Sequence, residues 1–183
     1  MREERRWLPA AVVTLVIVVV VLGGYVTAGA LAGGAGASHA VGGVVTVRPA
    51  PGWVFVGELG SSDAPARFTR GSATLDVLTG SAPGDARTLA QIYVEDTLDP
   101  SSNGLSVSPA TEWRAASLDG GLTGVRLGYS GIFDQSGVPI EGEVTAVVTS
   151  GGAGVVFDGW APQGQLRFAA DDVHAMVEEA TFP

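Results

Sequence analysis

The sequence lacks cysteine and lysine altogether, and each absence excludes a class of chemistry. Without cysteine the chain has no disulfide framework, no thiolate nucleophile, no iron–sulfur ligand and no site for lipobox-type lipidation. All 10 basic residues are arginine, so a Schiff-base lysine and a P-loop lysine are also excluded. The formal net charge of −9 argues against a nucleic-acid partner, because phosphate contacts need a basic surface.

Residues 8–26 form an apolar run without a single charged side chain. About 20 apolar residues cross the hydrocarbon core of a bilayer as a helix, so this run predicts one transmembrane helix. The preceding residues 1–7 contain three arginines, and no further lysine or arginine occurs before Arg48. The positive-inside rule therefore predicts a single-pass protein of the cell membrane, with a cytoplasmic N-terminus and an extracytoplasmic C-terminal domain.

A cleaved signal peptide is the alternative, with the small residues 28–30 as its cleavage site. The apolar run is long for a signal peptide, and we therefore favour a retained anchor. Residues 27–43 are dominated by glycine and alanine, which is typical of a flexible tether. Residues 44–183 form the exported domain, which carries most of the acidic residues and is long enough to build its own core.

Turn residues divide the exported domain into several β-rich segments and two helical ones. Helices are predicted at residues 88–98, where Thr88 and Gln91 form a capping-box pattern, and at 171–180, where two aspartates precede an apolar stripe. Strands are predicted at residues 44–47, 53–59, 66–69, 73–78, 105–108, 112–118, 125–133, 140–149 and 155–160. This order predicts an α+β domain in which helices pack on an antiparallel sheet.

Several packing landmarks occur in a characteristic order along this domain. They are Pro51-Gly52-Trp53 before a strand, the helical residues 89–93, the strand residues 124–129 and Ala180-Thr181-Phe182 after the last helix. In these landmarks the chain resembles the PsbP-like fold, shared with Mog- and DcrB-type proteins and with actinobacterial lipoproteins of the LpqN kind. The resemblance implies a non-enzymatic accessory or protein-binding role, linked in some envelope members to lipid export. The chain departs from the lipoproteins because it has no cysteine to carry a lipid.

In architecture and composition the chain also resembles small membrane-anchored proteins encoded with actinobacterial type VII secretion systems. That similarity implies a role as an accessory to secretion. It supplies no catalytic residue, and neither does the PsbP-like resemblance.

We find no constellation of catalytic residues in the sequence. Residues 128–131 come closest to a nucleophile elbow, but they lack its spacing and lie inside a predicted strand. A serine hydrolase would need one of the two histidines as its base, but His39 lies in the predicted tether and His174 on the last predicted helix. A carboxylate pair among Glu141, Glu143 and Asp158 supports the alternative function, an envelope hydrolase or transferase.

No metal site or cofactor is predicted. Residues 99–104 match the first half of an EF-hand calcium loop, but the position of its bidentate glutamate is occupied by Ala110. The glycine clusters lie in the tether and between strands, which does not fit a phosphate-binding loop.

Binding is the chemistry that remains. Trp160 stands at the end of a predicted strand, and Trp113 and Tyr129 lie on two others. We predict that these three aromatic residues border an apolar groove between the sheet and a helix, where they bind a ligand. The predicted function is a non-catalytic, membrane-anchored envelope module that binds a protein partner or an apolar ligand such as a lipid, as an accessory to secretion or lipid export.

Overall fold

The computed structural model describes residues 36–58, 65–98, 105–133 and 136–183. All of them belong to one compact unit, Ala35–Pro183. The predicted transmembrane segment, residues 8–26, lies outside the described residues. No helix within the described ranges is long and apolar enough to cross a membrane.

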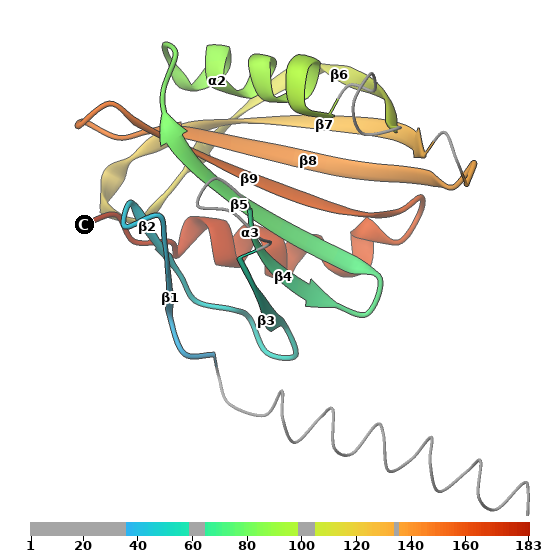
Figure 1. The fold of residues 1–183 in the computed structure, drawn as a ribbon, viewed down its shortest axis with the longest axis horizontal. Coiled ribbons are helices and arrows are strands. Elements are labelled where there is room, and N and C mark those ends of the chain that lie inside the picture. The colour runs from blue at the N-terminus through green and yellow to red at the C-terminus, as the bar shows by residue number, and fades with distance from the viewer. Residues whose placement is uncertain (1–35, 59–64, 99–104, 134–135) are drawn as a thin grey trace, which may run out of the picture. The chain divides into compact units, whose positions relative to one another are not determined.

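A large antiparallel sheet forms the middle layer of the domain (Figure 1). Its strands lie side by side in the order β3 (Val54–Glu58), β4 (Ala66–Arg70), β5 (Ala73–Ser81), β9 (Ala153–Pro162), β8 (Pro139–Val148), β7 (Thr123–Phe133) and β6 (Leu105–Ser117). The central strands β5, β9 and β8 are largely buried, whereas β3 and β6 are the edges. The predicted α+β class and its antiparallel sheet are confirmed.

Two helical segments cover opposite faces of this sheet (Figure 1). They are α2 (Ala86–Ile92), which continues as the π-helical turn η1 (Tyr93–Leu98), and α3 (Ala170–Glu178), which follows the short helix η3 (Leu166–Phe168). Because side chains alternate along a strand, one strand serves both cores. On β9, Phe157 packs in the core under α3 and Val156 in the core under α2.

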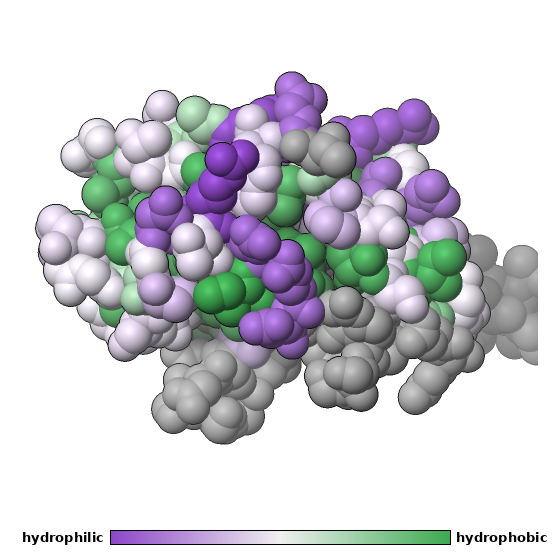
Figure 2. Space-filling model, turned by 90° about the horizontal axis from the view of Figure 1, so that it is seen from above, coloured by the Kyte–Doolittle hydropathy of each residue, from purple (hydrophilic) through white to green (hydrophobic). Residues whose placement is uncertain are grey.

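The helix α2 begins earlier than the capping-box pattern predicted. Asp85 is its N-cap, and Oδ1 of Asp85 accepts a hydrogen bond of 2.8 Å from the backbone N–H of Thr88. Asp85 has the extended backbone of an N-cap residue and lies directly before the first helical residue, whereas Thr88 already lies within the first turn of α2. From the side that carries α2, hydrophilic side chains form a band with apolar side chains beside it (Figure 2).

A small hairpin precedes the large sheet. Its strands are β1 (His39–Val41) and β2 (Val45–Val47), which pair antiparallel. β1 lies inside residues 27–43, the range that we expected to be a tether. Two consecutive glycines with positive φ, Gly42 and Gly43, make the hairpin turn here, where composition alone indicated a flexible linker. The ring of His39 stacks on Phe55 at a centroid distance of 4.1 Å.

The edge strand β6 joins two segments that the sequence predicted as separate strands, residues 105–108 and 112–118. Its pairing with β7 shifts register between Pro109 and Trp113. A proline has no N–H to donate to the ladder, and it is tolerated in β6 because an edge strand has a neighbour on one side only. The proline thus marks a bulge within one strand.

Candidate functional site

Three charged side chains lie in one row across the middle of the sheet. Arg67 on β4 is directly opposite Asp76 on β5, which in turn is opposite Asp158 on β9. Their neighbours in sequence, such as Leu75 and Phe157, point into the core under α3, so alternation places the charged side chains on the face that α2 covers. Asp76 and Asp158 are only 6% and 2% exposed. Buried charges of this kind need partners.

Asp76 is neutralised by an arginine. Nε of Arg67 donates to Oδ1 of Asp76 at 2.6 Å, and Nη2 donates to Oδ2 at 2.7 Å, which is a bidentate ion pair. The hydrogen bond to Asp76 raises the pKa of Arg67 above its ordinary value. The indole Nε1 of Trp160 adds a third donor to Asp76 Oδ2 at 3.3 Å. Both carboxylate oxygens of Asp76 are therefore occupied.

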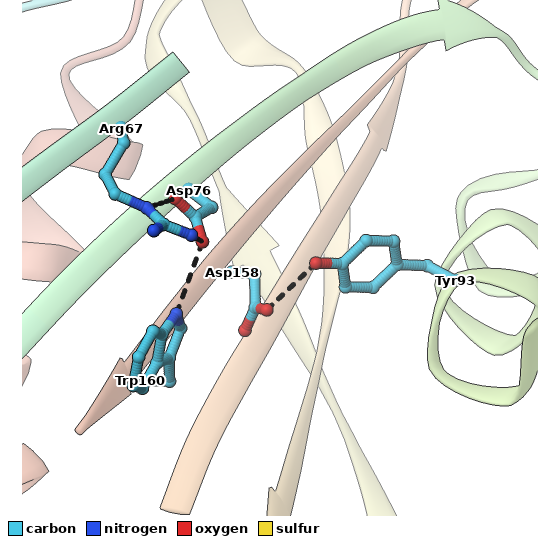
Figure 3. Close-up of polar contacts among 5 residues, drawn as sticks. All are labelled: Arg67, Asp76, Tyr93, Asp158 and Trp160. Carbon is cyan, nitrogen blue, oxygen red and sulfur yellow. Dashed lines mark hydrogen bonds and ion pairs between the residues drawn. The ribbon is translucent and has the colours of Figure 1, made fainter. Parts of the chain in front are cut away.

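Asp158 is held by two tyrosine hydroxyl groups instead of a cation. Oη of Tyr93 donates to Oδ2 at 2.9 Å, and Oη of Tyr129 donates to Oδ1 at 2.8 Å. Figure 3 shows Tyr93 reaching Asp158 from η1, next to the pair of Arg67 and Asp76. Burial raises the pKa of Asp158 to about 7, although the two hydrogen bonds act in the opposite direction. Burial and the Asp158 charge also raise the pKa values of both tyrosines.

These side chains lie on the wall of a cleft between η1 and the sheet. The cleft has a volume of about 300 Å³. Its lining is apolar and aromatic around the charged row and consists of Pro65, Arg67, Asp76, Leu78, Tyr93, Leu98, Tyr129, Phe133, Ile140, Asp158 and Trp160. The π-helical turn contributes Tyr93 and Leu98, and such turns are frequent at functional sites. A mostly apolar cleft with a few fixed polar groups is the usual form of a ligand site.

The structure brings together two of the three aromatic residues predicted to bind a ligand. Tyr129 and Trp160 line the cleft, and the ring of Trp160 meets that of Phe133 edge to face at a centroid distance of 5.9 Å. Trp113 lies elsewhere, in a separate depression of about 220 Å³, where the guanidinium of Arg87 sits 4.8 Å from its ring centroid. Ligand binding by these residues stays a prediction.

Of the three carboxylates proposed for the alternative enzymatic function, Asp158 lies apart from the two glutamates. Glu143 is opposite Gly159 on β9, so Glu143 and Asp158 project from opposite faces of the sheet. Oε1 of Glu143 lies 2.6 Å from Nε2 of His174, and Glu141 Oε1 accepts from the backbone N–H of Leu166 at 2.9 Å. These two glutamates line a more open depression of about 620 Å³ on the face that α3 covers.

Sequence reasoning missed three residues of the site, namely Asp76, Arg67 and Tyr93. Asp76 interrupts an apolar strand, between Leu75 and Val77, where a charge is costly unless it is paired. That interruption is the signal that could have identified it. Asp158 interrupts its own strand in the same way, after Phe157.

The other chemical candidates gain no support from the described part of the chain. It contains no group of three side chains that could ligate a metal ion. The loop considered for calcium, residues 99–104, lies outside the described residues. His174 contacts Glu143, and Ser130 of the predicted elbow lies inside β7, opposite Glu141 on β8.

No protein-family model and no curated protein matches the chain. Solved structures do. The cyanobacterial PsbP protein CyanoP of Synechocystis aligns with a TM-score of 0.57 and 16% identity, over 82% of this chain and 95% of its own. LpqN of Mycobacterium tuberculosis, involved in cell envelope biogenesis, aligns with a TM-score of 0.55 and 16% identity, over 82% and 87%. The predicted PsbP-like fold is thus confirmed.

Proposed function

We propose that this PsbP-like domain is a non-catalytic binding module of the cell envelope. Residues 8–26 hold it at the outer face of the membrane, and the cleft between η1 and the sheet receives a small ligand or an anchoring group of a protein partner. The apolar run with its basic flank supports the anchor. The fold shared with an envelope protein, LpqN, supports the cellular setting.

One observation above all carries the binding function: the carboxylates of the cleft are held in place by hydrogen bonds from neighbouring side chains. Both oxygens of Asp76 accept hydrogen bonds from Arg67, and both oxygens of Asp158 accept hydrogen bonds from tyrosines. A hydrogen bond donated to a carboxylate oxygen lowers the basicity of the carboxylate and fixes its orientation, which suits binding better than attack on a substrate. Such a cleft can select and hold a ligand, but its carboxylates are not placed to attack one.

Native mass spectrometry of the full-length chain, purified in a non-ionic detergent from its own membranes, tests this function. We expect a bound species at one copy per chain, which solvent extraction releases for identification. Loss of that species on Trp160→Leu, with the melting temperature kept, places it in the cleft. A chain that is empty and stays empty when membrane extract is added would contradict the proposal.

The anchor is tested separately. In fractionated cells the full-length chain should sediment with membranes and be degraded by protease added outside intact spheroplasts. A variant lacking residues 1–34 should remain in the cytoplasm and resist that protease. Release of a soluble mature domain into the medium would instead indicate the cleaved signal peptide.

An envelope hydrolase remains the second candidate, on a different carboxylate pair from the one the sequence indicated. Asp76 and Asp158 lie directly opposite each other on the adjacent strands β5 and β9, and the pKa of Asp158 is raised to about 7. In catalytic pairs of carboxylates, such a difference in pKa lets one group act as the acid and the other as the base. Turnover of an ester, peptide or glycoside substrate by the purified chain, abolished by Asp158→Asn, would establish this function. We expect no turnover.

A further inference from the structure

The negative charge of the cleft is only half compensated. Arg67 is the sole cationic residue among the described residues that line it, and both of its hydrogen-bonding nitrogens face Asp76. Asp158 receives hydrogen bonds from neutral tyrosines alone. When Asp158 is ionised, the wall of the cleft therefore carries one uncompensated negative charge next to an open volume of about 300 Å³. A buried carboxylate without a counter-ion is costly, and a bound cation would remove that cost.

Aromatic rings surround the same volume. Phe133 and Trp160 are half-buried, and their ring planes meet at 71°, which forms a corner open to the cleft. Tyr93 and Tyr129 line it further in, beside Asp158. Ring faces carry negative electrostatic potential, and several rings set at angles to each other are the usual receptor for alkylated ammonium groups. Indole and phenyl rings also supply the apolar surface that the methyl groups of such a cation require.

We propose that the cleft binds an alkylammonium group, with the Asp158 carboxylate as its counter-charge and the rings of Trp160 and Phe133 around it. This inference rests on the proposed binding function and names the chemical class of the ligand. An anion fits the cleft worse, because it would lie beside two carboxylates and compete with Asp76 for Arg67. The cation can be a free small molecule or the headgroup of a lipid, since both present the same chemistry.

Proton binding competes with the cation for Asp158. The titratable and charged groups that face this carboxyl are Asp76 on β5, Arg67 on β4, Tyr93 on η1 and Tyr129 on β7. Burial raises the pKa of Asp158 to about 7, so the carboxyl loses its proton across neutral pH. The affinity for the cation should therefore rise as the pH rises, by about tenfold between about pH 6 and pH 8.

Isothermal titration calorimetry of the full-length chain in a maltoside detergent provides the test. Choline is the probe. The first control is dimethylbutanol, in which carbon replaces the nitrogen of choline, and the second is the anion dimethylbutanoate. We expect choline to bind at least about tenfold more tightly than the neutral isostere, and the anion not to bind.

Two variants locate the site. Asp158→Asn keeps the shape of the side chain and should remove both the preference for choline over dimethylbutanol and the pH dependence. Phe133→Leu should weaken choline binding by about fivefold. The matched control Phe168→Leu removes an exposed ring that is stacked with Arg167 and does not line the cleft, and choline binding should be unchanged. If Asp158→Asn does not fold, Phe133→Leu still decides the location.

The outcomes separate this inference from the function it rests on. Equal affinity of the cleft for choline and dimethylbutanol would overturn the proposal that the cleft selects a cation. It would leave the proposed binding function intact. Absence of choline binding, in a chain that retains another ligand in native mass spectrometry, would do the same. A short-chain phosphatidylcholine that binds more tightly than choline supports the alkylammonium site and identifies a lipid headgroup as its source. Equal affinity supports the site with a free cation as the source.

Discussion

Replacing Asp158 by asparagine removes the ionisable carboxyl from the cleft while preserving the size of the side chain. The amide oxygen of asparagine can still accept a hydrogen bond from one tyrosine, and its NH₂ group can donate to the other. The variant therefore isolates the cost of a buried charge. That cost depends on pH, and its sign follows from the two pKa values of the native and unfolded states.

The pKa of Asp158 is about 7 in the native state, against an ordinary value of 3.8. Between these values the native state holds a proton that the unfolded state has released, so the stability of the wild type falls as the pH rises. The protonated Asp158 carboxyl contributes fully to the stability of the native state below the ordinary pKa. This contribution is lost as the pH rises through the native pKa. With about 1.4 kcal/mol for each pKa unit, the loss between about pH 5 and pH 8 amounts to about 3 kcal/mol.

Urea denaturation of both proteins, followed by far-ultraviolet circular dichroism at a series of pH values, measures this effect. The difference in unfolding free energy between Asp158→Asn and the wild type should shift by about 3 kcal/mol in favour of the variant from about pH 5 to pH 8. The control Thr145→Val alters a buried side chain that does not titrate, and its difference from the wild type should stay constant. A pH-independent difference for Asp158→Asn would mean that the pKa of Asp158 is not raised in the native state.

Other substitutions test the packing around the cleft. Arg67→Met leaves Asp76 buried without its cation, so unfolding in urea should show a loss of about 3 kcal/mol, whereas a small loss would mean that the ion pair is not needed. In Gly142→Ala the new Cβ would overlap the ring of Tyr129, and the variant should lose about 1–3 kcal/mol. Gly128→Ala is the control, because its Cβ would meet no atom closer than 3.9 Å, and a comparable loss there would count against the overlap.

Most of the sheet could be predicted because local signals mark it. Turn residues and alternating apolar positions gave the extent of β7 and β8 nearly as the structure has them. The end of the tether and the start of α2 were harder to predict, because in each case the same residues fit two different local structures. A Gly-Gly pair serves equally well in a linker and in a tight hairpin, and both Asp85 and Thr88 are good N-cap residues.

The site could be predicted only in part, because it depends on which strands are neighbours. Tyr129 and Trp160 were identified as aromatic residues on strands that border a helix, and both line the cleft. The pairing of Asp76 with Asp158 arises because β5 lies next to β9, which is distant in sequence. Without that register, Asp158 was grouped with Glu143, although the two project from opposite faces.

Fluorine NMR of the full-length chain labelled with fluorotryptophan can show whether the cleft is the ligand site. The chain has 4 tryptophans, and single Trp→Leu variants assign their signals. On saturation with the ligand recovered from the native membrane, we expect the signal of Trp160 to shift while those of Trp113 and Trp53 stay in place. A saturated complex in which Trp160 does not respond, or in which Trp113 responds instead, would contradict this expectation.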